Sequence, residues 1–178
     1  MSVTYVAFLR GINLGKRRVK NEQLSAIFGS LGFTDVTVLI ASGNVVFTAD
    51  DAEDDRLTRT VEAGLEQALG FQVSTMLRRA SEIQAMIALD PFKGIEVTKQ
   101  TRLYVTLLAD ETRSTMPLPY ASDDGNFRIL SRTDREVYSV LTVAETGRTV
   151  DLMAVVEKEY GKRSTTRNWN TIVKLAAI

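Results

Sequence analysis

Residues 36–47, with the sequence VTVLIASGNVVF, decide the fold because two apolar, β-branched runs flank four small or polar residues. The runs 36–40 and 45–47 predict adjacent antiparallel strands. The four residues between them predict a short polar turn, since glycine and asparagine tolerate the backbone angles that tight turns require.

The segments on either side extend this hairpin into a β-α-β-β-α-β unit. Residues 3–9 form an apolar run that indicates a strand buried on both faces. A helix is predicted on each side of the hairpin, and 71–77 is predicted as the fourth strand. The apolar positions that define the two helices are Leu24, Ile27, Phe28 and Leu31, then Leu57, Val61, Leu65 and Leu69. This order is ferredoxin-like, with an added helix from Ser81 that stops before Pro91.

A less regular version of the same order follows. Residues 103–109 predict a strand, 127–130 and 137–143 a hairpin, and the segment from Asp151 to Gly161 a helix. We therefore expect an α+β protein with two ferredoxin-like βαββαβ halves and mostly antiparallel sheets, the second half being the less regular. The expected domains are residues 1–94, with the added helix, and residues 95–178.

The tail of the chain predicts a final helix with an unusual polar start. Trp169, Ile172, Val173 and Ala176 recur at helical spacing. Ser164 or Thr165 is the expected N-cap, which would place Arg167 beside free backbone N–H groups. Such a helix end can bind an anion.

Composition excludes much chemistry. The chain of 178 residues contains no cysteine and no histidine, so disulfides, thiolate nucleophiles, imidazole bases and Cys/His zinc sites are ruled out. A metal would need oxygen ligands, and no carboxylate spacing typical of calcium or two-metal sites is present. We expect no metal and no cofactor.

Charge and hydropathy bear on location and partners. The chain has 22 basic and 22 acidic residues, which counts against a nucleic-acid partner without excluding one, although residues 16–20 are locally basic. Neither a leader pattern nor an apolar run long enough for a bilayer is seen, so we expect a cytoplasmic protein that does not interact with membranes. The sequence does not indicate an oligomeric state.

Three motifs carry a family resemblance. Residues 8–13 (FLRGIN), 41–47 (ASGNVVF) and 167–171 (RNWNT) together resemble the bacterial family called domain of unknown function 1697. The resemblance implies a mixed α+β protein with ferredoxin-like halves and no established activity, cofactor or substrate. This chain departs from the family pattern at Gly15-Lys16, where a Gly-Gly pair is usual, and at Thr149, where serine is usual.

The same motifs supply the candidate site. We hypothesise a pocket between the halves for a small anionic or nucleotide-like ligand, because guanidinium and amide groups suit phosphate and carboxylate oxygens. The predicted ligand-binding residues are Arg10, Asn13, Ser42, Asn44, Arg167, Asn168 and Asn170. Of these, the arginines with Ser42 and Asn44 are expected to converge at one partly open cleft. Trp169 is interpreted as a core residue rather than a stacking platform.

Two alternatives remain open at this level. Ferredoxin-like sheets also carry RNA-recognition motifs, although residues 42–47 lack the required basic and aromatic pattern. The polar motifs could instead be structural, in which case their side chains would be buried and mutually hydrogen-bonded. Asp151, Tyr138 and Lys174 are eligible for proton transfer, but no spacing singles one out, so the sequence leaves open whether the protein is an enzyme.

Overall fold

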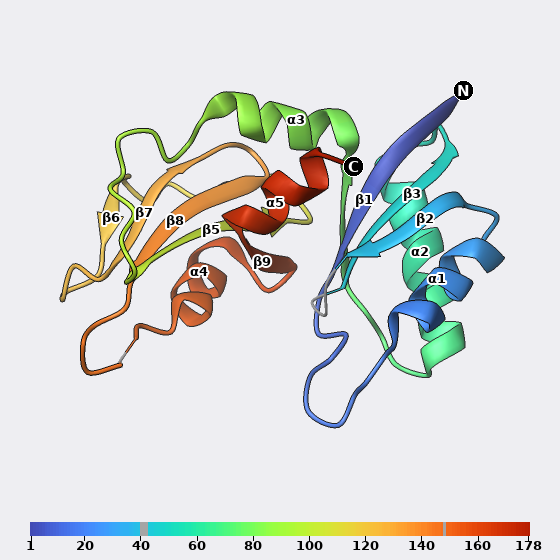
Figure 1. Ribbon diagram of the computed structural model, residues 1–178, viewed down its shortest axis with the longest axis horizontal. Helices are drawn as coiled ribbons and strands as arrows, with labels where there is room; N and C mark the ends of the chain where they lie inside the picture. Colours follow the sequence, from blue (N-terminus) through green and yellow to red (C-terminus); the bar gives the residue numbers. More distant parts are fainter. Residues whose placement is uncertain (40–42, 148) are drawn as a thin grey trace. The chain divides into compact units, whose positions relative to one another are not determined.

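The computed structural model describes residues 1–178 except 40–42 and 148. The chain divides into two compact units, Met1–Gln84 and Ala85–Ile178, and each is considered by itself below. One unit contains a four-stranded sheet and the other a five-stranded sheet, so the predicted α+β class is confirmed (Figure 1). The boundary predicted from the sequence lies later, after residue 94.

The first unit has the predicted β-α-β-β-α-β order. Its elements are β1 (Ser2–Leu9), α1 (Asn21–Ser30), β2 (Thr34–Leu39), β3 (Asn44–Asp50), α2 (Asp54–Leu69) and β4 (Thr75–Arg79). The strands lie in the order β2-β3-β1-β4, and every neighbouring pair is antiparallel. The added helix α3 (Ala80–Leu89) follows β4, and the division between the units falls within it.

The core of the first unit forms between the sheet and its two helices. Alternate residues of β1, beginning with Tyr5, join one hydrophobic cluster with the apolar stripes of α1 and α2. Phe28 of α1 meets Phe47 of β3 edge to face, with ring centroids 5.2 Å apart. Gly70 ends α2 in a left-handed conformation with φ of +81°, as the sequence predicted.

The second unit repeats the strand plan without its first helix. Its elements are β5 (Thr101–Leu108), β6 (Tyr120–Ala121), β7 (Phe127–Arg132), β8 (Glu136–Thr142), α4 (Leu152–Tyr160), β9 (Ser164–Asn168) and α5 (Trp169–Ala176). The strand order is β6-β7-β8-β5-β9, which is that of the first unit plus the edge strand β6. Residues 109–119, all described, run without a helix where α1 lies in the first unit. The second half is therefore the less regular one, as predicted.

The predicted start of the final helix is wrong. Residues 164–168 form β9, which pairs with β5, and α5 begins only at Trp169 with Asn168 as its N-cap. Thr165 and Thr166 are β-branched and suit a strand, and Thr166 Oγ1 lies 2.8 Å from Thr106 Oγ1 across the ladder. The periodic residues from Trp169 onward do form the helix, whereas pairing with β5 makes residues 164–168 a strand.

Two smaller differences concern strands. The fourth strand begins at Thr75 rather than at residue 71, and the backbone N–H of Thr75 donates to Glu62 of α2 at 2.9 Å. The short edge strand β6 was not predicted, because two residues are too few for a period to be visible.

Candidate functional site

Two of the three motifs meet at one end of the four-stranded sheet. The backbone N–H of Leu9 donates to the Gly43 carbonyl at 2.9 Å, and that of Arg10 donates to the Ser74 carbonyl at 2.9 Å. Asn44 faces Phe8 across the ladder. Arg10, at the exit of β1, therefore lies beside the start of β3. Ser42, the remaining predicted residue of this segment, lies outside the described residues.

Gly43 is required by the packing of these motifs. Its φ is +75°, a conformation that residues with a side chain rarely adopt. A Cβ atom at this position would lie 2.9 Å from Ile12 Cγ2 and 3.1 Å from Leu9 Cβ. The two motifs are thus in direct contact, and the glycine makes that contact possible.

The two asparagines of this end hold the backbone. Asn44 is 0% exposed, and its side-chain amide donates to the Leu39 carbonyl at 3.1 Å. The side-chain oxygen of Asn13 accepts a hydrogen bond from the Val19 N–H at 2.9 Å. These contacts match the structural alternative for both amides.

The basic loop after the first motif is also organised internally. Arg18 Nη1 donates to the carbonyls of Gly15 at 2.9 Å and Arg17 at 2.6 Å. The Arg17 guanidinium lies 4.1 Å from the centre of the Phe71 ring, within cation–π range. Both arginines therefore contribute to the structure of the loop itself.

In the second unit, the RNWNT motif spans the end of β9 and the start of α5. Arg167 is 7% exposed and faces Val105 across the ladder. Its Nη1 donates to Thr165 Oγ1 at 2.6 Å and to the Thr166 carbonyl at 3.2 Å. Burial lowers the pKa of Arg167 to about 10, because removal of water destabilises the charged guanidinium.

The remaining side chains of this motif divide between core and surface. The Trp169 ring is half-buried and lies 5.2 Å from Phe92 and 6.2 Å from Tyr138, so it packs at the edge of the core in an aromatic cluster. Asn168 and Asn170 are exposed. They flank the first residue of α5, where backbone N–H groups carry partial positive charge.

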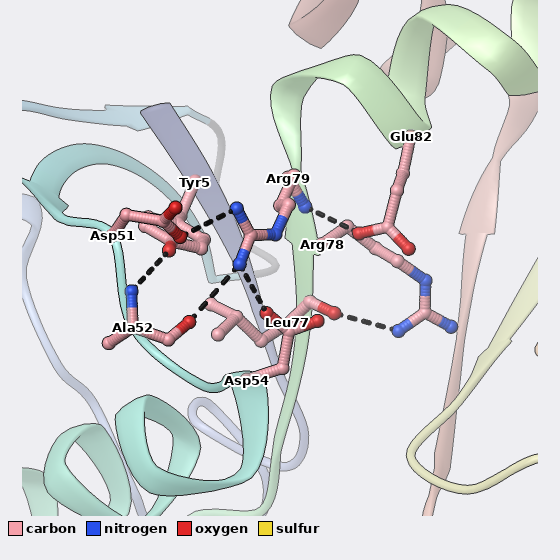
Figure 2. Close-up of polar contacts among 8 residues, drawn as sticks. All are labelled: Tyr5, Asp51, Ala52, Asp54, Leu77, Arg78, Arg79 and Glu82. Atoms are coloured by element: carbon pink, nitrogen blue, oxygen red, sulfur yellow. Dashed lines mark hydrogen bonds and ion pairs between the residues drawn. The ribbon is translucent and has the colours of Figure 1, made fainter. Parts of the chain in front are cut away.

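Arg79 is the centre of a polar cluster in the first unit that the sequence analysis missed (Figure 2). Arg79 binds Asp51 Oδ1 at 2.9 Å, the Ala52 carbonyl at 3.1 Å and Asp54 Oδ1 at 3.4 Å. Its guanidinium lies 5.4 Å from the Tyr5 ring centre. The hydrogen bond from Arg79 to Asp51 raises the pKa of this arginine. The cluster ties β4 to the segment between β3 and α2, and no spacing in the sequence identifies it.

The fourth strand carries a second, buried arginine. Arg78 is 0% exposed, and its Nη1 donates to the Leu77 carbonyl at 2.8 Å. The backbone N–H of Arg79 donates to Glu82 Oε2 at 2.7 Å, which fixes the first turn of α3.

In the part of the chain that the structure describes, no helix is long and apolar enough to cross a membrane.

The geometry defines an α+β protein built from two ferredoxin-like units, with polar motifs at the ends of strands. Residues 2–138 match the family described as "Protein of unknown function (DUF1697)", so the chain belongs to this family, as its motifs predicted. The structure is similar to that of the conserved bacterial protein SP0830 from Streptococcus pneumoniae, with a TM-score of 0.76 and 19% identity over 99% of this chain and 98% of the other. At that identity, the likeness shows a shared fold. Comparison with curated proteins gives no match.

Proposed function

We propose that this protein binds a small anionic ligand that carries phosphate or carboxylate groups, with nucleotide-like molecules included. In the second unit the proposed contacts are Arg167, Asn168 and Asn170, and in the first unit Arg10 is proposed as a contact for the same class of anion. The buried guanidinium of Arg167 is the observation that carries the proposal.

The argument from Arg167 is electrostatic. Its burial disfavours the charged form, which is why its pKa falls to about 10. An anion close to this guanidinium would favour the charged form again, and the interaction is stronger in partly dehydrated surroundings than in water. Asn168 and Asn170, both exposed, add amide donors next to the N-terminal end of α5. This arrangement supports recognition of an oxyanion.

The other predicted residues take positioning roles in the proposal. Asn13 accepts a hydrogen bond from the Val19 N–H and Asn44 donates to the Leu39 carbonyl, so in the proposal they hold the segments that follow β1 and β2. Ser42, which follows β2 and precedes β3 in the sequence, stays a proposed contact.

A thermal-shift panel tests the proposal. Inorganic phosphate, pyrophosphate, nucleotides, sugar phosphates and dicarboxylates are compared at constant ionic strength, since a ligand that binds the native state raises its Tm. We expect at least one anion to raise the Tm of the wild-type chain in a saturable way. No shift with any of them would contradict the proposal.

Matched variants separate specific binding from net charge. Asn170→Asp places a negative charge at the proposed contact and should abolish the shift, whereas Lys158→Gln lowers the net charge equally from an exposed position on α4 and should retain it. Arg10→Gln should also reduce the shift. If Asn170→Asp and Arg10→Gln both respond like wild type, these residues are not contacts.

A structural role is the second candidate, and the hydrogen bonds of Asn13 and Asn44 favour it. In that case the motifs serve folding or assembly without a ligand. Asn44→Ala would then lower stability by about 1–3 kcal/mol because the Leu39 carbonyl loses its donor, while the whole anion panel stays blank. RNA binding remains a prediction that a salt-dependent filter-binding titration would test.

A further inference from the structure

A second site is suggested by a cavity of about 470 Å³ in the second unit. It opens where the loop after β5 meets the end of α4, and its volume lies in the range of small-molecule sites. The lining residues are Leu108, Asp110, Glu111, Thr112, Arg113, Ser114, Glu159, Tyr160, Gly161, Lys162 and Arg163. None of them belongs to the three sequence motifs.

The cavity lies at the sheet end that corresponds to the motif end of the first unit. The backbone N–H of Ala109 donates to the Arg163 carbonyl at 2.9 Å, just as that of Arg10 donates to Ser74. In the first unit the chain then enters a loop and α1. In the second it continues as residues 109–119, which lie beside α4 without forming a helix.

One polar pair fixes a wall of the cavity. The Ser114 hydroxyl donates to Glu159 Oε1, and the Met116 N–H donates to Ser114 Oγ at 3.2 Å. The Ser114 carbonyl in turn accepts from Arg132 Nη2 at 3.0 Å. The loop and α4 therefore hold the Glu159 carboxylate in a defined position.

The neighbouring Tyr160 presents a buried hydroxyl. Among the residues that the structure describes, Tyr160 Oη has no hydrogen-bond partner. Burial raises the pKa of Tyr160, against the lowering effects of nearby Ser114 and Arg132. Ser114 has one proton and gives it to Glu159, so a ligand atom could complete the hydrogen bonding of Tyr160.

The charges of the lining select the ligand class. Asp110, Glu111 and Glu159 supply negative charge, and Arg113, Lys162 and Arg163 supply an equal positive charge. Asp110 and Arg163 pair with each other at 3.0 Å. A purely anionic or cationic ligand would face like charges here, whereas a zwitterion can satisfy both signs.

We propose that this cavity binds a free α-amino acid. Its ammonium group would lie against Glu159, its carboxylate against Arg113 and Lys162, and Tyr160 would hydrogen-bond a polar atom of the ligand. This site is separate from the proposed anion contacts, so either proposal can fail without the other.

Calorimetric titration of the full chain with each of the standard amino acids tests the assignment. At least one should bind saturably, and its N-acetyl and its amide derivatives should each bind about tenfold more weakly or worse, since each lacks one charge. No binding by any amino acid would overturn the proposal, as would derivatives that both bind as tightly as the free amino acid.

Variants locate the binding. Glu159→Gln and Tyr160→Phe should each weaken binding, the first by about tenfold, while Lys158→Gln on the same helix should not. Tyr160→Phe keeps the aromatic ring and breaks no hydrogen bond to the described residues of the loop. It therefore remains informative if Glu159→Gln disturbs folding. The site is contradicted if Tyr160→Phe and Glu159→Gln both bind with wild-type affinity. It is also contradicted if Tyr160→Phe binds like wild type and Lys158→Gln loses as much affinity as Glu159→Gln does.

Discussion

The two units share a sheet plan but differ in the connection after the first strand. Arg78 faces Val6 in one ladder, and Arg167 faces Val105 in the corresponding position of the other. Both arginines are buried, and each precedes the last residue of its strand. In the first unit β1 leads to α1, whereas β5 leads to a loop that borders a cavity. The buried arginine therefore belongs to the common plan, and the units diverge where the chain leaves the first strand.

The strand ends sharpen this comparison. The Leu9 N–H donates to the Gly43 carbonyl at 2.9 Å, and the Leu108 N–H donates to the Arg135 carbonyl at 2.8 Å. Only in the first unit does this position need a glycine, because Ile12 packs against it. Both units thus have this backbone hydrogen bond at the end of the first strand. Only in the first unit is it accompanied by close packing between the two motifs.

The largest effect is expected from the helix that only the first unit has. Phe28→Ala should lower the free energy of unfolding by about 3–5 kcal/mol, because the ring is fully buried against Phe47. Met116→Ala, in the half-buried loop that replaces this helix in the second unit, should cost less than half as much. Urea unfolding measures both. Equal costs would mean that the loop supports its unit as strongly as the helix does.

A smaller effect is expected at the strand ends. Gly43→Ala should cost about 1–3 kcal/mol, since the new methyl group overlaps Ile12 and the backbone conformation is strained. Arg135→Ala, at the matching position, should cost less than about 1 kcal/mol. Thermal unfolding of the two variants tests the difference, and a neutral Gly43→Ala would show that the motif contact is not required.

The smallest effect concerns pH and the second unit. Burial raises the pKa of Tyr160 above its ordinary value of 10.0, so at alkaline pH the unfolded chain loses this proton first. Because the unfolded state then binds fewer protons, stability should fall as pH rises through and above about 10. Urea unfolding at a series of alkaline pH values should show a shallower fall for Tyr160→Phe. Parallel curves would indicate that Tyr160 does not titrate differently in the two states.

Much of the fold was predictable because its signals are local. Helical spacing located α1 and α2, and alternating or continuous apolar runs located β1, β3 and β5. The end of α2 was visible as Gly70. The failure at β9 has a different cause, since residues 164–168 become a strand only through pairing with β5, more than fifty residues earlier.

The candidate site was predictable in part. Contact between residues 9–12 and Gly43 follows from strands that are neighbours in the predicted hairpin unit. The burial of Arg167 and the bonding of Asn44 to Leu39 depend on packing that no spacing reveals. For the same reason Arg79, Ser114 and Glu159 went unnoticed, because their partners lie far away in the sequence.

Calorimetric titration with the most stabilising anion of the panel tests the central claim most directly. The wild-type chain should bind it saturably, and Arg10→Gln and Arg167→Gln should each weaken binding about tenfold or more, as expected when a charged hydrogen-bond donor is lost. Lys158→Gln should bind like wild type. If no anion binds, or if both arginine variants retain wild-type affinity, the motifs do not form an anion site.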